Sequence, residues 1–193
     1  GDVMYDNSLH FAALAEKQSK ILEKLDLAGK RFVLATIHRN QNTDDAERLQ
    51  FLFNALTKTA ISEQIEIVLP LHPRTQKMLE QNGIEICEEA RKLLRIIPPV
   101  SFLDMIMLEK HSSLVMTDSG GVQKEAFYFE KPAIILRPET EWVEIVEQGT
   151  AVLAASTEEE LVNQARNFLA NPPNEFPQIF GDGNAAKFIC QTM

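Results

Sequence analysis

A serine and two glycines in the segment 117–125, TDSGGVQKE, are residue types suited to binding phosphate. Gly120 and Gly121 let the backbone approach an anion without interference from a Cβ atom, and the free amides of a following helix point at it. Ser119 adds a hydroxyl donor. Glu125, one helical turn past Gly121, lies on the same face, where a carboxylate can accept both hydroxyls of a ribose. The segment is predicted to bind the phosphates and ribose of a nucleotide, and a tight turn with a serine cap is the simpler alternative.

Two histidines directly follow predicted strands, and an arginine comes one or two positions after each. His38 is followed by Arg39, and His72 by Arg74. A lone histidine is more often a structural residue, but we expect both of these to face one cleft. A metal site is the competing interpretation, and no His, Asp or Glu spacing typical of metal ligands supports it. We therefore predict no metal.

Histidines, arginines and glycines gather in the loops that leave the predicted strands. In an open parallel sheet, ligands bind outside the carboxyl ends of the strands, where helix N-termini and loops meet. Arg137 lies in the last of these loops, and Trp142 just beyond it is predicted either to cover a sugar or to pack a short helix. Loops that enter the strands are ordinary polar connectors. The five exit loops are 38–42, 72–75, 98–101, 118–121 and 137–141.

Apolar β-rich runs alternate with helical patterns along nearly the whole chain, which predicts βα units and a parallel sheet. The near-continuous hydrophobicity of the strands is typical of a sheet covered by helices on both faces. One domain over residues 1–193 is the simplest organisation. Thr43, Ser101 and Ser156 are predicted helix N-caps. Strands are predicted at 31–37, 65–70, 93–97, 113–117, 133–136 and 151–154, and helices at 8–26, 44–59, 102–110, 121–129, 157–169 and 184 to the end.

Composition argues against several classes of function. The formal net charge is −9, so the surface as a whole repels a nucleic-acid backbone, while a local positive patch can still bind a small anion. Cys87 and Cys190 have no CxxC spacing and are expected to be reduced thiols of a cytoplasmic protein. No apolar run approaches the length of a membrane span, and the start lacks the order of a signal peptide. Neither a P-loop nor a GxGxxG pattern occurs, so neither a P-loop NTPase nor a standard dinucleotide site is supported.

Taken together, these loops resemble the C-terminal domain of the non-hydrolysing UDP-N-acetylglucosamine 2-epimerases, a bacterial family with the two-lobed GT-B fold. The motifs are GDVMYD, IHRNQN, LHPRT, TDSGGVQKEAFYFEKPAIILRPETEW, VEQGT and FGDGNAAKFI, and they span nearly all 193 residues. TDSGGVQKEA, followed by KP and an arginine-containing loop, is highly specific. The resemblance implies a Rossmann-like three-layer α/β/α lobe, in which helices at 1–30 and 184–193 pack near the inter-lobe hinge.

The resemblance also implies roles for individual residues around the phosphate turn. His38 would contact the diphosphate and sugar, as the catalytic residue that this lobe supplies. Ser119, Gly120 and Gly121 would bind the phosphates of UDP. Glu125 would bind the ribose hydroxyls.

Further residues are implied to surround this UDP site. The segment 98–105 would flank the uracil, with Phe102 or Met105 as its apolar contact. Arg39 and His72 match positions that, in some members, bind a second UDP-sugar as an allosteric activator. Arg137 is a candidate sugar or phosphate contact.

The resemblance implies a reaction that eliminates UDP from the sugar, gives an unsaturated, glucal-type intermediate and adds UDP back with C2 inverted. That route needs an acid/base group near C2 and firm binding of the departing UDP. The resemblance places the acid/base carboxylates in an N-terminal lobe that would precede Gly1. This chain is therefore expected to be an inactive half of an isomerase for polysaccharide biosynthesis. The whole enzyme would be a homodimer without a cofactor.

Two departures from the family pattern leave the substrate open. Gln41 replaces the acid of the usual HRxEN loop, and the loop after the fifth strand reads PETEWVE where TTERPE is usual. A UDP-linked diacetamido-uronic acid is thus an alternative to UDP-N-acetylglucosamine. The sequence is also compatible with a UDP-dependent GT-B glycosyltransferase, a hydrolysing epimerase or a non-catalytic nucleotide-sugar sensor.

Overall fold

The computed structural model describes residues 1–192 as an α/β fold around one parallel sheet. The strand order is β3-β2-β1-β4-β5-β6, and each neighbouring pair is parallel. The chain winds from β1 to one edge and returns to the centre to build the other half from β4, as in doubly wound folds. Each strand lies within its predicted range: Phe32–Thr36 (β1), Glu66–Pro70 (β2), Leu94–Ile97 (β3), Leu114–Thr117 (β4), Ala133–Ile135 (β5) and Ala151–Leu153 (β6).

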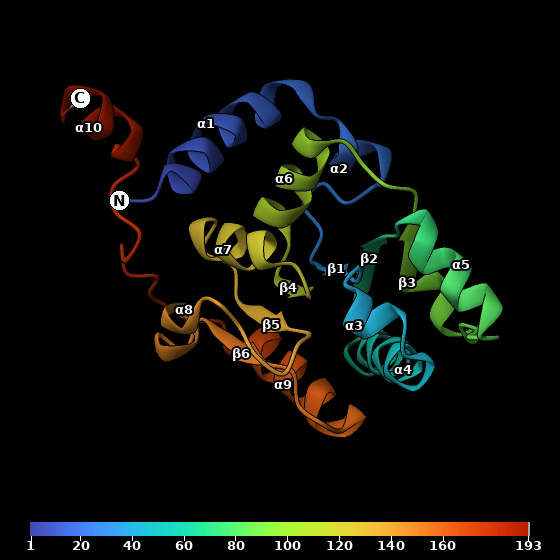
Figure 1. Cartoon of the computed structure of the whole chain (residues 1–193). Coiled ribbons are helices and arrows are strands. Elements are labelled where there is room, and N and C mark those ends of the chain that lie inside the picture. Colours follow the sequence, from blue (N-terminus) through green and yellow to red (C-terminus); the bar gives the residue numbers. More distant parts are fainter. Residues whose placement is uncertain (193) are drawn as a thin grey trace.

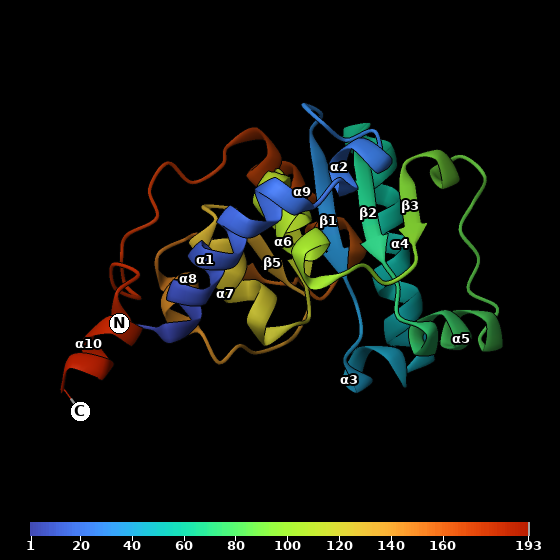
Figure 2. The ribbon, with the colours of Figure 1, turned by 90° about the horizontal axis from the view of Figure 1, so that it is seen from above.

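Helices cover both faces of this sheet, which confirms the three-layer arrangement (Figures 1 and 2). α1, α2, α6 and α7 lie on one face, and α4 and α9 lie on the other. The helices are α1 (Val3–Gln18), α2 (Ile21–Lys24), α3 (Asn40–Thr43), α4 (Ala46–Glu63), α5 (Pro73–Gln81), a 3-10 turn (Ala90–Lys92), α6 (Phe102–His111), α7 (Gly120–Tyr128), α8 (Val143–Glu147), α9 (Glu158–Ala170) and α10 (Ala185–Thr192).

Alternate residues of β1 pack against the helical layers on the two faces of the sheet. Val33 and Ala35 pack into the core shared with α4 and α9. Phe32 and Leu34 pack into the core shared with α1 and α6. Successive side chains of a strand point to opposite faces, and all five residues of β1 are buried. This explains the unbroken apolar run, and it gives the chain a hydrophobic core of its own on both faces of the sheet.

The N-terminal helical region differs from the single helix predicted over 8–26. α1 starts earlier because Asp2 caps it, accepting the Met4 amide at 2.8 Å. The helix then ends before Ser19, whose hydroxyl donates to Asp104 of α6 at 2.5 Å. A separate α2 follows. At the break, the Ser19 hydroxyl contacts both the Ile21 amide at the start of α2 and a partner 85 residues away, and the apolar pattern indicates neither contact.

Two of the three predicted N-caps are wrong by one or two positions. Ser101 caps α6 as predicted. Asp45, not Thr43, caps α4, because the chain first forms the short α3, which buries Thr43. Thr157, not Ser156, caps α9, and its hydroxyl accepts a backbone amide at 3.3 Å. The predictions contained no α3, α5 or α8. α3 and α8 have only four and five residues and so carry little apolar periodicity. α5 begins at Pro73, within a segment that was assigned to an exit loop.

The two ends of the described chain pack together. Asp6 of α1 accepts the amides of Ala185 and Ala186 at 3.1 and 2.7 Å, and so caps α10. The N-terminus accordingly lies beside α10 in both views (Figures 1 and 2). The last position of the predicted C-terminal helix, residue 193, lies outside the described residues.

Candidate functional site

Two of the predicted exit loops meet where the strand order reverses, between β1 and β4. Thr36 pairs with Thr117 in the register of these strands, and their hydroxyl oxygens are 2.5 Å apart. His38 and Ser119 each follow two residues later, so they leave the sheet next to each other. This reversal is the point at which open α/β sheets bind ligands.

Asp118 joins these two loops, a role that the sequence analysis missed. Its buried carboxylate accepts the backbone amides of His38 and Arg39 at 3.0 and 2.9 Å, and the Asn42 side chain at 3.0 Å. Burial acts to raise the pKa of Asp118, but these hydrogen bonds outweigh it and hold the pKa below its usual value. A carboxylate directly after a strand, at the same edge as His38, was the available signal.

His38 is oriented by the same carboxylate. Its Nδ1 lies 3.0 Å from Oδ1 of Asp118, while half of its side chain is exposed. The hydrogen bond to Asp118 raises the pKa of His38, although burial opposes the shift. Because Nδ1 is engaged, Nε2 is the nitrogen left for a ligand. The pair therefore presents a ring that is more readily protonated than a free histidine, with one donor available.

The turn after β4 has the local geometry of an anion site. Ser119 caps α7, and its hydroxyl accepts the Val122 amide at 3.4 Å. α7 begins at Gly120, so the amides of Gly120 and Gly121 belong to the first turn and have no acceptor within the helix. Such amides, together with the helix dipole, favour a negative charge in front of them.

Arg39 and Glu141 lie beside Gly120, and Arg137 pairs with the same glutamate. A Cβ atom on this glycine would lie 3.5 Å from the guanidinium of Arg39 and 3.6 Å from the carboxylate of Glu141. Arg137 is only 5% exposed, and both of its terminal nitrogens donate to Glu141, at 2.8 and 2.9 Å. These bonds lower the pKa of Glu141 to about 2. Both terminal nitrogens of Arg137 are thus occupied by Glu141. Arg39 is the arginine beside the turn that remains partly exposed.

A hollow of about 250 Å³ beside the turn collects several of the predicted site residues. Met105 lines it. Phe102 does not, because its ring packs edge-on against Phe11, with the ring centres 5.1 Å apart, and is otherwise exposed. Of the two candidates for the uracil contact, the structure therefore brings Met105 to the site. The hollow is lined by Thr36, Ile37, His38, Pro70, His72, Pro99, Val100, Met105, Ser119 and Val122.

Two carboxyl groups lie deeper between α6 and α7. Burial raises the pKa of Glu125, which is partly exposed. Glu109 of α6 is 1% exposed, and within residues 1–192 its Oε2 has no hydrogen-bond partner. Burial, and to a lesser extent the charge of Glu125, raise the pKa of Glu109 well above its usual value. Glu125 is therefore the carboxyl of this pair that ionises first.

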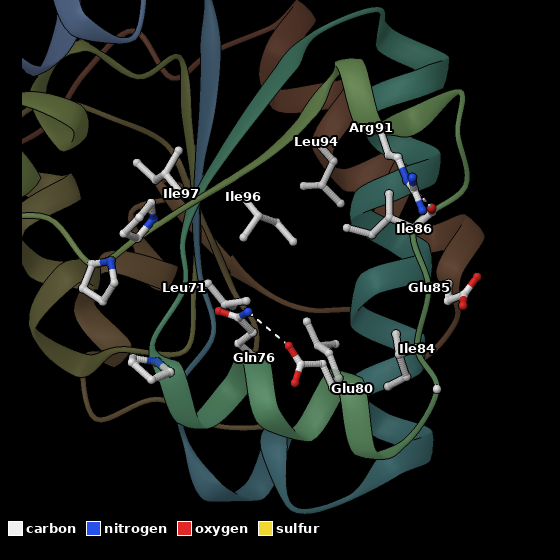
Figure 3. A pocket seen from close by; sticks show the side chains of 15 residues that line it. Leu71, Gln76, Glu80, Ile84, Glu85, Ile86, Arg91, Leu94, Ile96 and Ile97 are labelled. Atoms are coloured by element: carbon white, nitrogen blue, oxygen red, sulfur yellow. Dashed lines mark hydrogen bonds between the residues drawn. The ribbon is translucent and has the colours of Figure 1, made fainter.

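A larger hollow, of about 950 Å³, lies at the outer edge of the sheet, beside β3 and α5 (Figure 3). Its walls are mainly apolar, with Leu71, Leu94 and Ile96 among them. Gln76 donates to Glu80 at 3.1 Å on its α5 side. Pro73, Pro98 and Pro99 of two exit loops reach it, but His38, Met105 and Ser119 line the smaller hollow beside the turn. Its size therefore does not make it the functional site.

Within the part of the chain that the structure describes, no three His, Cys, Asp or Glu side chains come together as metal ligands. No helix among residues 1–192 combines the length and the apolar character needed to cross a bilayer. Cys87 and Cys190 are both exposed free thiols.

The reversed strand order, with a glycine-containing turn at the reversal, defines a Rossmann-like α/β domain. The family model for UDP-N-acetylglucosamine 2-epimerase matches residues 1–193, and the chain belongs to that family. It spans about half the length of the curated relatives that it matches, consistent with a C-terminal domain.

Two relatives of similar identity have different named substrates. A UDP-N-acetylglucosamine 2-epimerase homolog of Methanococcus maripaludis is 40% identical over 100% of this chain and 53% of its own length. The UDP-2,3-diacetamido-2,3-dideoxy-D-glucuronate 2-epimerase of Pseudomonas aeruginosa is 41% identical over 99% of this chain and 51% of its own length.

Solved structures match the same half. The Methanocaldococcus jannaschii UDP-GlcNAc 2-epimerase, in complex with UDP-GlcNAc and UDP, superposes with a TM-score of 0.88 at 32% identity, covering 100% of this chain and 53% of that one. The described fold therefore has the architecture of one lobe of the two-lobed GT-B fold.

Proposed function

We propose that this chain is the UDP-binding half of a UDP-N-acetylglucosamine 2-epimerase. The observation that carries the proposal is the convergence of the Asp118-bound His38 and the Ser119 turn at the strand reversal of a chain in this family. A cation and free helix amides on adjacent loops suit a diphosphate.

Each part of the nucleotide has a candidate contact. The amides of Gly120 and Gly121, with the Ser119 hydroxyl, bind the phosphates. Glu125 accepts the ribose hydroxyls, and Met105 contacts the uracil. The phosphate and uracil roles rest on the family resemblance, on the start of α7 at Gly120 and on the hollow that Ser119 and Met105 share. The role of Glu125 rests on the family resemblance.

His38 is proposed to stabilise the departing diphosphate. Elimination breaks the bond between C1 and the phosphate oxygen, and that oxygen gains the electron pair. A protonated Nε2, favoured by Asp118 at Nδ1, donates to this developing charge. The base that removes the C2 proton, and the acid that returns a proton to the opposite face, belong to the N-terminal lobe in this proposal.

UDP-2,3-diacetamido-2,3-dideoxy-D-glucuronate is the second candidate substrate. The Pseudomonas aeruginosa relative named for it is 41% identical, and the homolog named for UDP-N-acetylglucosamine is 40% identical. An experiment with the full-length protein distinguishes the two substrates. The protein is incubated with each UDP-sugar separately, and it should equilibrate the C2 epimers of one of them. Proton NMR follows the epimers. A UDP-sugar left unchanged until an acceptor is added would indicate a glycosyltransferase instead.

Partners of the whole enzyme are also proposals. Its own N-terminal lobe, a second copy in a homodimer and a UDP-sugar are expected, whereas nucleic acid is not. Phe188 and Ile189 on α10 are exposed apolar side chains, which suits packing by another part of the enzyme. A cytoplasmic location suits the exposed thiols of Cys87 and Cys190.

Calorimetry with UDP tests the site. The 193-residue chain should bind UDP, and Glu125→Ala should weaken binding about 10-fold or more, as expected for the loss of hydrogen bonds to a charged group. Glu144→Ala, an exposed glutamate of α8, is the matched control and should bind as the wild type does. If the wild-type chain binds no UDP at millimolar concentration, the site assignment is wrong.

A further inference from the structure

A buried lysine follows the phosphate turn and is enclosed by aromatic rings. Lys124 of α7 is 4% exposed. Its ammonium nitrogen lies 3.9 Å from the ring centre of Trp142 and 4.8 Å from that of Phe180, and it donates a hydrogen bond to Asp2. Burying an ammonium group requires such compensation, through ion pairing and the negative faces of aromatic rings. The nucleotide contacts proposed above do not include this cluster.

Trp142 connects the cluster to the turn itself. Its indole Nε1 donates to the carbonyl oxygen of Gly120 at 2.9 Å. The Trp142 backbone amide donates to Thr140 Oγ1 at 3.0 Å, and that hydroxyl approaches Gln123 of α7 at 2.6 Å. Trp142 is therefore fixed by Lys124 on its ring face and by Thr140 at its backbone amide, and its indole N–H donates to the Gly120 carbonyl.

The bond to Gly120 constrains a phosphate-binding amide. The carbonyl of Gly120 and the N–H of Gly121 belong to one planar peptide group, and in a trans peptide they point in opposite directions. Fixing the carbonyl toward Trp142 consequently fixes the direction of the Gly121 N–H. Preorganised donors bind an anion more tightly than donors that must first be oriented.

Asp2 extends the cluster to the start of the chain. Its carboxylate caps α1 through the Met4 amide, accepts the Tyr128 hydroxyl at 3.1 Å and pairs with Lys124. Its own amide donates to the Phe180 carbonyl at 2.9 Å. The buried ammonium group of Lys124 on α7 therefore contacts three other parts of the chain: the start of α1, the loop before α8 and the segment before α10.

We propose that Lys124 and Trp142 are positioning residues for the phosphate turn, acting on nucleotide diphosphates through the Gly120–Gly121 peptide. This inference rests on the proposed UDP site. Lys124 holds the indole face, the indole N–H holds the Gly120 carbonyl, and the Gly121 amide is thereby directed at the phosphate. Neither side chain touches the nucleotide.

The test compares UDP with uridine in three variants. Trp142→Phe keeps a ring but removes the N–H donor, Lys124→Met keeps the length of the side chain but removes the charge, and Lys58→Met, an exposed lysine of α4, is the control. The first two should weaken UDP binding by about 3- to 10-fold, the range of one hydrogen bond, and leave uridine binding within 2-fold. Lys58→Met should change neither. Calorimetry measures UDP, and ligand-observed NMR measures uridine.

A spectroscopic signature accompanies the affinities. Trp142 is the only tryptophan of the chain, so its emission reports on this cluster alone. UDP should change the emission of the wild-type chain, and uridine should change it less. Lys124→Met should shift the emission without any ligand, because the charge above the indole is removed.

Folding of the variants is checked by thermal melting. Asp2→Asn combined with Lys124→Met removes both members of the ion pair, and it replaces Lys124→Met if the single variant is unstable. Equal losses of UDP and uridine binding, or unchanged UDP binding in Trp142→Phe and in the lysine variant, would overturn this inference while leaving the UDP site intact. Absence of UDP binding by the wild type would instead overturn the proposed function, and the inference with it.

Discussion

At the scale of single residues, the ion pair of Asp118 and His38 has a defined pH range. The pKa of Asp118 is lowered and that of His38 is raised in the folded chain. A lowered carboxyl pKa stabilises the fold above its unfolded value, near 3.8, and this contribution is lost as the pH falls. A raised histidine pKa stabilises the fold below its unfolded value, near 6.5, and this contribution is lost as the pH rises through the folded value. The pair therefore stabilises most between these two limits.

Asp118→Asn should lower the pKa of His38 below that of the wild-type chain, because the hydrogen bond that raises it is weakened while burial still opposes protonation. The measurement is an NMR titration of the His38 ring. Asp44→Asn, an exposed carboxylate paired with Arg74, is the control and should leave the His38 titration unchanged. An unchanged titration in Asp118→Asn would contradict the role given to this carboxylate.

Glu109 makes a second residue-scale prediction. Its pKa is raised in the folded chain, so the wild type loses stability as the pH rises from the unfolded value, near 4.5, through the folded one. Glu109→Met removes this penalty and should stabilise the chain by about 1–3 kcal/mol at pH 8, the cost of an unsatisfied buried polar group, and by less at pH 4. Urea unfolding at the two pH values measures the difference.

The exposed Glu159→Met is the matched control for Glu109 and should show no such pH-dependent gain. A gain in Glu109→Met that is equal at pH 4 and pH 8 would mean that better packing, and not the removal of a titrating carboxyl, causes it.

At the scale of elements, the cap of α9 offers a direct comparison of two adjacent residues. Thr157→Ala should destabilise the chain by about 1 kcal/mol, because the hydroxyl that accepts the first-turn amide is lost. Ser156→Ala should have little effect, since Ser156 was the predicted cap but does not occupy that position. Thermal unfolding of both variants is the measurement, and the opposite order would restore the sequence-based assignment.

Strands were predictable because burial on both faces leaves continuous apolar runs, such as the one in β1. Helix ends were less predictable. At the end of α1, for example, the Ser19 hydroxyl donates to Asp104, which is far away in sequence. The Ser119-capped turn after β4 could be predicted from its own residue types. The role of Asp118 was missed, because its place directly after a strand was only a weak signal and its donors come from another loop, brought to it by the pairing of β1 with β4.

At the scale of the whole molecule, the chain has a hydrophobic core on both faces of one sheet and about half the length of its relatives. The 193-residue chain should therefore bind UDP yet leave UDP-N-acetylglucosamine unchanged, whereas the full-length protein should interconvert its C2 epimers. Proton NMR of the sugar anomeric region, with both proteins at equal concentration, measures this. Epimerisation by the short chain would show that the acid and base lie within it.

The pairing of β1 with β4 also bears on how the molecule folds. The hydroxyls of Thr36 and Thr117, and the ion pair of His38 with Asp118, join residues about 80 positions apart. Contacts this distant in sequence form only after a long loop has closed, which is slow. The candidate site is then absent from early folding species, so UDP should slow unfolding of the chain and leave its refolding rate nearly unchanged.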